Sequence, residues 1–189
     1  MRLSLVLRVA ALGLVAALFA VLVYRLVHGS GSGVAQAAKA HREPQVPDVR
    51  VHVISPGVGL WPRGLRRPAA GDELAFADLH GYRIVINFWA SWCEPCRREA
   101  PVLAAAATAE RGRVVFVGVD INDLGSDASR FLRDHHVPYP VTRGSGSVAD
   151  RFGVVGLPET FYVDAAGRIT DVTEGQVTAS ILQRELRPS

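Results

Sequence analysis

The only two cysteines of this 189-residue chain lie in the motif Trp92-Cys93-Glu94-Pro95-Cys96, directly after the apolar run 84–90. A continuous apolar run of this kind is typical of a strand buried on both faces of a sheet. The Ala-rich segment that follows predicts a helix over about residues 93–110, with Cys93 at its N-terminus. Two cysteines spaced in this way lie on one helical turn, close enough to form and break a disulfide. The pattern therefore indicates a strand–CxxC–helix unit with redox chemistry.

The position of each cysteine predicts its role. Unpaired backbone N–H groups and the positive end of the dipole favour a thiolate at a helix N-terminus. We therefore expect Cys93 to be the attacking sulfur and Cys96 to resolve the mixed disulfide, with no cofactor besides this dithiol. The alternatives are an inert pair or half of a zinc site. Zinc needs four ligands, and no further cysteine is present, while the histidines show no ligand spacing: His28, His41, His52, His80, His135 and His136. We expect no metal.

The N-terminal segment predicts a membrane anchor over residues 1–27. Its stretch 9–24 is 16 residues long and carries no charge. Sixteen helical residues span about 24 Å, short of the roughly 30 Å hydrocarbon core, but Arg8 and Arg25 can snorkel outward at its two ends. The alternative is a signal peptide cleaved in the small-residue stretch 35–40. That stretch lies more than ten residues beyond the apolar run, farther than is usual, so we favour an uncleaved anchor.

Charge and composition divide the remainder of the chain. The Gly/Ser run 29–33 and the residues up to Pro47 predict a flexible tether over 28–47. A flexible segment of about 20 residues has an average end-to-end distance of roughly 25 Å. Residues 1–42 carry five basic side chains and no acid, whereas the rest carries 16 basic and 18 acidic side chains. The predicted domain, residues 48–189, therefore offers no basic face for nucleic acid.

Within this domain the hydrophobic pattern alternates between strands and helices. Strands are expected over 49–54, 73–76, 83–90, 113–120, 160–164 and 168–172, and helices over 93–110, 126–136, 148–152 and 177–186. Pro101 is expected to bend the first helix, and the Gly/Pro/Arg-rich segment 56–70 is expected to be a loop. Strand–helix–strand–helix followed by a hairpin and a helix is the thioredoxin-like arrangement, an α/β fold with a central mixed sheet flanked by helices.

Two motifs carry a family resemblance: NFWASWCEPCRREAP over 87–101 and GLPETF over 156–161. Over about residues 72–187 the chain resembles the membrane-anchored TlpA/ResA/CcmG (DsbE) branch of thioredoxins. The Pro-Glu-Thr triplet is most similar to CcmG, and the Glu-Pro dipeptide between the cysteines to ResA, so the subfamily stays open. The resemblance implies a single-pass membrane protein, monomeric, whose extracytoplasmic domain reduces the CxxCH cysteines of apocytochrome c with electrons from a membrane donor.

The resemblance also implies roles for four uncharged residues. Pro158 matches the cis-proline that faces the CxxC motif, and the backbone of Leu157 matches the segment that pairs with an extended substrate peptide. The alternative for Pro158 is an ordinary turn before a strand. Trp92 and Pro95 flank the sulfurs at the expected substrate-binding surface. We expect Trp92 to shield the disulfide, although packing at the helix start would also explain it.

Three acids are candidates for tuning the dithiol. Glu99 lies three residues after Cys96, on the same helix face, and it matches a family acid near the active site. Glu159 follows Pro158 and matches the CcmG-type acid, while Glu94 lies between the cysteines. A nearby carboxylate opposes thiolate formation and so predicts a reducing couple; an acid can also shuttle the proton of Cys96. The alternatives are a solvated helix residue for Glu99 and a strand-edge surface carboxylate for Glu159.

Two other functions remain as alternatives. The first is general thiol–disulfide exchange or an oxidant of the DsbA type, which the acids and the lack of a histidine between the cysteines disfavour. The second is a tethered binding or chaperone module with a structural disulfide. The reduction potential separates the first alternative from a reductase, and trapping of covalent partners separates the second.

Overall fold

The structure is a computed structural model that describes residues 12–21, 23, 33–40 and 42–187. It divides into two units, Met1–Ser32 and Gly33–Ser189. In the first unit the described residues, 12–21 and 23, are helical and expose apolar side chains such as Leu14 and Phe19. The rest of the predicted anchor lies outside the described residues. Among the residues that are described, no helix has the length and hydropathy needed to cross a membrane.

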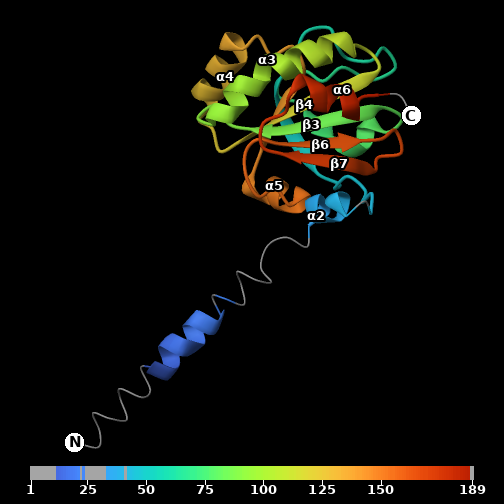
Figure 1. Ribbon diagram of the computed structural model, residues 1–189. Coiled ribbons are helices and arrows are strands. Elements are labelled where there is room, and N and C mark those ends of the chain that lie inside the picture. The colour runs from blue at the N-terminus through green and yellow to red at the C-terminus, as the bar shows by residue number, and fades with distance from the viewer. Residues whose placement is uncertain (1–11, 22, 24–32, 41, 188–189) are drawn as a thin grey trace, which may run out of the picture. The chain divides into compact units, whose positions relative to one another are not determined.

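The second unit is built on a seven-stranded mixed sheet (Figure 1). In spatial order its strands are β2 (Glu73–Ala75), β1 (Arg50–Ser55), β5 (Val141–Gly144), β4 (Val114–Ile121), β3 (Arg83–Trp89), β6 (Glu159–Val163) and β7 (Ile169–Glu174). The central strands β3, β4 and β5 are parallel, and the flanking strands pair antiparallel. This sheet confirms the predicted α/β architecture with a central mixed sheet.

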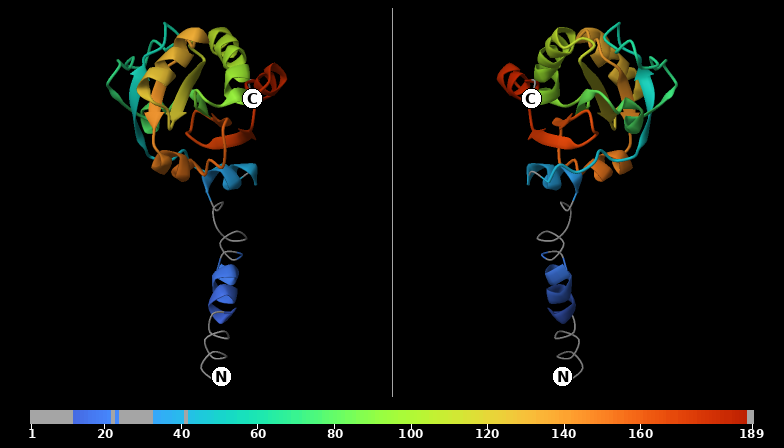
Figure 2. Two further views of the ribbon diagram at one scale, coloured as in Figure 1. Left: turned by 90° about the vertical axis from the view of Figure 1, so that its left-hand side faces the viewer. Right: turned by 90° about the vertical axis from the view of Figure 1, so that its right-hand side faces the viewer.

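Helices cover both faces of the sheet (Figure 2). On one face lie α3 (Glu94–Ala109), α4 (Gly125–Asp134) and α6 (Ala179–Glu185), and on the other lie α2 (Val34–Lys39) and α5 (Gly146–Phe152). A 3-10 turn, η1 (Phe76–Leu79), follows β2. The helix predicted over 93–110 is confirmed to within one residue at each end, and α3 continues through Pro101. Each face of the sheet thus has its own hydrophobic core.

The two cores differ in what they contain. The core beneath α2 and α5 is built around the fully buried rings of Phe76, Phe88, Phe152 and Phe161, whose centroids lie 5.1–5.6 Å apart. Burying one such ring contributes about 1.5–3 kcal/mol. The core beneath α3, α4 and α6 contains both cysteines. The redox pair is therefore packed into the domain rather than displayed on a surface loop.

Two elements differ from the sequence-based expectations. Strand β5 was not predicted, because its four residues follow Pro138 and Pro140 and precede a Gly/Ser run, so no alternation marks them. Helix α2 lies within the segment expected to be a flexible tether. It buries Ala35 and Ala38 against the domain, so that the compact unit begins at Gly33 rather than at residue 48. Residues 28–32 of the expected tether lie outside the described residues.

Candidate active site

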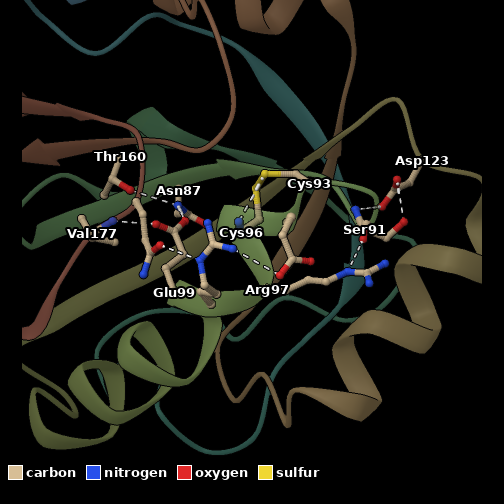
Figure 3. The surroundings of a disulfide bond; sticks show 12 residues. Asn87, Ser91, Cys93, Cys96, Arg97, Glu99, Asp123, Thr160 and Val177 are labelled. Carbon is tan, nitrogen blue, oxygen red and sulfur yellow. Dashed lines mark hydrogen bonds and ion pairs between the residues drawn. A yellow bond between two sulfur atoms is a disulfide. The ribbon is translucent and has the colours of Figure 1, made fainter.

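The cysteine pair lies where β3 passes into α3. Cys93 is the N-cap of α3, and its Sγ accepts a hydrogen bond from the backbone N–H of Cys96 at 3.3 Å (Figure 3). This bond satisfies one of the N–H groups that every helix leaves unpaired at its start. Cys93 and Cys96 form a disulfide, with 5.3 Å between their Cα atoms. The sequence-predicted position of Cys93 at the helix start is thus confirmed.

The two cysteines differ little in exposure. Cys93 is 4% exposed and Cys96 is 1% exposed, so both are buried in the disulfide form. Trp92, immediately before them, is 63% exposed. The Trp92 ring therefore projects toward solvent, and its exposure fits a surface that contacts another molecule.

Glu99 is the centre of a buried hydrogen-bond network on one side of the disulfide (Figure 3). Its Oε1 accepts from Asn87 Nδ2 at 2.8 Å, and its Oε2 accepts from the Val177 backbone N–H at 2.8 Å. Asn87 also donates to Thr160 Oγ1 at 2.9 Å. Burial raises the pKa of Glu99 to about 7, although both hydrogen bonds act to lower that pKa. The alternative of a solvated helix residue is therefore excluded.

Glu159 is also buried, but on the other face of the sheet. Side chains alternate along a strand, and Glu159 shares its face of β6 with Phe161, which packs in the core beneath α5. Its Oε2 accepts from the Val155 N–H at 3.1 Å, while Oε1 has no hydrogen-bond partner among the residues that the structure describes. Burial raises the pKa of Glu159, and Glu174 adds to the rise, while Val155 and Lys39 oppose it. Burial also excludes the surface-carboxylate alternative.

The other predicted site residues surround the pair. Glu94 and Pro95 form the first turn of α3, and exposed Glu94 pairs with Arg98 at 3.2 Å, so that its charge is partly compensated. The Leu157–Pro158 peptide bond is cis, as the resemblance implies. Leu157 is partly buried and packs against both hydrophobic cores, one of which contains the two cysteines.

A second polar network, which sequence analysis missed, lies on the other side of the disulfide (Figure 3). Asp123 accepts from the Ser91 N–H at 2.7 Å and from Ser91 Oγ at 2.9 Å. Arg143 donates to the Asp123 carbonyl at 2.7 Å, and its Nη2 lies 3.1 Å from the carboxylate of fully buried Asp120. Burial, together with the neighbouring Asp123, raises the pKa of Asp120 to about 7, and Arg143 opposes the rise.

Sequence signals for these missed residues are weak but present. Asn87 is the one polar residue within the otherwise apolar run 84–90, and Asp120 lies at the end of the next apolar run. A polar side chain in a buried strand needs a hydrogen-bond partner. The sequence therefore marks both positions as unusual, but it does not identify their partners. In the described part of the chain, no group of three or more His, Cys, Asp or Glu side chains has the arrangement of a metal site.

The chain is similar in sequence to known thiol:disulfide interchange proteins. A family model described as Redoxin matches residues 44–186. The thiol:disulfide interchange protein HelX of Rhodobacter capsulatus is 35% identical over 139 residues, which cover 71% of this chain and 73% of HelX. The thiol:disulfide interchange protein DsbE of Pseudomonas fluorescens biotype C is 38% identical over 119 residues, covering 61% of this chain and 65% of that DsbE. This chain therefore spans slightly less than two thirds of the length of the latter relative.

A solved structure shows the same fold. The structure of MTB dsbF in its mixed oxidized and reduced forms superposes with a TM-score of 0.62 at 28% sequence identity. The match covers 74% of this chain and 96% of that one.

Proposed function

This chain belongs to the Redoxin family, within its TlpA/ResA/DsbE-like thiol–disulfide oxidoreductases, and we propose that it acts as an extracytoplasmic protein-disulfide reductase. The observation that carries the proposal is the Cys93–Cys96 disulfide at the start of α3, where Cys93 caps the helix and accepts the Cys96 N–H. A sulfur at this position gains from the helix N-terminus when it ionises. Cys93 is therefore the nucleophile and Cys96 the resolving thiol.

The reaction proceeds in two exchanges. In the reduced protein, the Cys93 thiolate attacks one sulfur of a substrate disulfide; that S–S bond breaks, and the other substrate sulfur leaves as a thiolate and is protonated. Cys96 then loses its proton and attacks the Cys93 sulfur, which releases the second substrate sulfur and forms the Cys93–Cys96 disulfide. Two electrons pass from the dithiol to the substrate. A dithiol donor in the membrane restores the reduced form.

The acids near the pair set the direction of transfer. Glu99 lies one turn beyond Cys96 on α3, and its carboxylate, where ionised, opposes a second negative charge on the sulfurs. A destabilised thiolate favours the disulfide and gives a reducing couple. Glu159 and Glu94 act in the same sense. Trp92, Pro95, Leu157 and cis-Pro158 form the surface that receives the substrate polypeptide.

The substrate follows from the family resemblance. The CxxCH cysteines of apocytochrome c, oxidised before haem attachment, are the proposed target of this dithiol. The domain works as a monomer outside the cytoplasm, held at the membrane by residues 1–27. Exposed apolar side chains on the helical residues 12–21 support such an anchor. The full-length protein should then fractionate with membranes; an N-terminus near Ala38 or Ala40 in the mature protein would show cleavage instead.

A redox titration of the full-length protein tests the direction of transfer. We expect a potential nearer to that of thioredoxin, about −270 mV, than to that of DsbA, about −120 mV. A potential above about −150 mV would overturn the reductase in favour of an oxidant.

Trapping tests the roles of the two cysteines. Cys96→Ser should accumulate mixed disulfides through Cys93, because the resolving thiol is gone, whereas Cys93→Ser should accumulate none. Equal trapping by both variants would contradict the assignment. Binding of partners without any trapped disulfide would favour the binding-module alternative.

A further inference from the structure

We propose that Asp123 is a positioning residue for the thiol chemistry: it fixes the loop that carries Cys93 and thereby keeps the Cys93 sulfur at the N-terminus of α3. The inference rests on the proposed thiol–disulfide exchange, since it concerns the position of the attacking sulfur. Asp123 lies in the β4–α4 connection, far from the CxxC motif in sequence.

The contacts tie the loop at every polar group of Ser91. Its N–H and its hydroxyl both donate to the Asp123 carboxylate, at 2.7 and 2.9 Å. Its carbonyl accepts from Arg97 Nε at 2.9 Å, and the Cys93 N–H donates to the Ala90 carbonyl at 3.2 Å. Only Trp92 separates Ser91 from Cys93. The backbone that leads into the N-cap is therefore held from both sides, by the β4–α4 connection and by α3.

A half-buried guanidinium holds the backbone of Asp123 in turn. Arg143, on β5, donates to the Asp123 carbonyl and forms an ion pair with Asp120, whose buried carboxylate oxygens have no hydrogen bond to any described residue. Buried charged groups are costly, and replacing such clusters with apolar side chains is often neutral or stabilising. Stability is thus a poor explanation for two buried carboxyl groups at this position. Orientation of the Ser91 loop is an explanation that the contacts support.

The direction in which the pKa of the Cys93 thiol changes distinguishes a positioning role of Asp123 from a purely electrostatic effect of its charge. Removing a nearby carboxylate by itself favours the thiolate and lowers the pKa of the Cys93 thiol. Releasing the loop instead withdraws the sulfur from the helix N-terminus and raises that pKa. The two effects of losing Asp123 therefore act in opposite directions, and positioning predicts that the rise dominates.

The experiment compares variants of the reduced full-length chain by thiolate absorbance against pH. Asp123→Ala should raise the pKa of the Cys93 thiol by about 0.5 and slow disulfide exchange at neutral pH about threefold, because only the thiolate attacks. Asp123→Asn, which keeps one acceptor oxygen, should restore part of the change. Asp127→Asn, which removes an acid from the first turn of α4, is the charge control and should not raise the pKa.

Two further measurements keep the test decisive. Ser91→Ala retains the backbone bond to Asp123 and should shift the thiol pKa in the same direction by less; it decides the matter if Asp123→Ala fails to fold. A pKa of the Cys93 thiol that falls or stays unchanged in both Asp123→Ala and Ser91→Ala would overturn the positioning role. Absence of disulfide exchange in the unaltered protein would overturn the proposed function, while the thiol pKa would still decide the role of Asp123.

Discussion

Glu99 and Glu159 resemble each other in sequence context, yet they occupy opposite faces of the sheet. Both are 1% exposed, and each follows a residue of the redox motifs at short spacing. On the α3 face, both oxygens of Glu99 accept hydrogen bonds, from Asn87 and Val177. On the α5 face, Oε2 of Glu159 accepts from Val155, and within the described part of the chain Oε1 has no partner. Of these two buried acids, Glu99 thus has both carboxylate oxygens hydrogen-bonded, whereas Glu159 has only one.

This difference shows that burial alone does not define the role of a carboxyl group. A fully bonded acid such as Glu99 ties α3 to β3 and to the segment before α6, so that removing it leaves donors unpaired. An acid with an unsatisfied oxygen contributes less structure and responds more readily to nearby charge. The following predictions test this contrast between the Glu99 and Glu159 regions.

The largest expected difference is in stability. Glu99→Ala leaves the buried N–H groups of Asn87 and Val177 without their acceptor and should lower the free energy of unfolding by about 2–4 kcal/mol. Glu159→Ala removes the acceptor of the Val155 N–H and should cost about 1–2 kcal/mol. Denaturant unfolding of the oxidised full-length variants measures both. Equal losses would remove the structural distinction between the two acids.

The pH dependence of stability should follow Glu99. Its pKa is raised from 4.5 to about 7 in the folded protein, so the folded state binds the proton more tightly than the unfolded chain. The stability that this proton contributes is fully present below about pH 4.5 and is lost as the pH rises through about 7. Glu99→Gln abolishes that contribution.

The informative quantity is the difference in unfolding free energy between the wild type and Glu99→Gln. It should change with a slope of up to about 1.4 kcal/mol per pH unit within this window. Asp120, whose pKa is also about 7, is present in both proteins and cancels. Parallel pH profiles for the two proteins would show that Glu99 does not titrate in this range.

Smaller effects are expected on the thiols. Replacing either acid with Gln removes repulsion toward a thiolate, so the thiol pKa should fall and the reduction potential should rise. Glu99→Gln should lower the thiol pKa by up to about 1, and mainly above pH 7, where Glu99 is ionised; Glu159→Gln should act more weakly from the other face. Thiolate absorbance measures both. A larger fall in Glu159→Gln would reverse the comparison.

The sequence predicts those features that depend on neighbours along the chain. The apolar run before the cysteines and the Ala-rich segment after them suffice to predict β3, α3 and the N-terminal position of Cys93. By contrast, the bonds between Ser91 and Asp123 join residues 32 positions apart, and Glu99 meets Val177 across 78. Such pairings depend on how β3, β4 and α6 pack together. A motif that places Glu159 beside Pro158 likewise does not say which face of the sheet its carboxyl enters.

The smallest expected effect concerns Lys39 on α2. Lys39 pairs with Glu174, the β7 residue that lies directly opposite Glu159 of β6. An exposed ion pair of this kind contributes at most about 1 kcal/mol to stability. Lys39→Gln removes a charge that lowers the pKa of Glu159 and leaves Glu174, which raises it. The pKa of Glu159 should therefore rise while that of Glu99 stays unchanged.

NMR titration of the carboxyl carbons measures both groups, with Lys39→Arg as the control that keeps the charge. Because salt screens exposed charges, the rise should shrink at high ionic strength. An equal change at Glu99 would mean that the two regions are electrostatically coupled through the sheet.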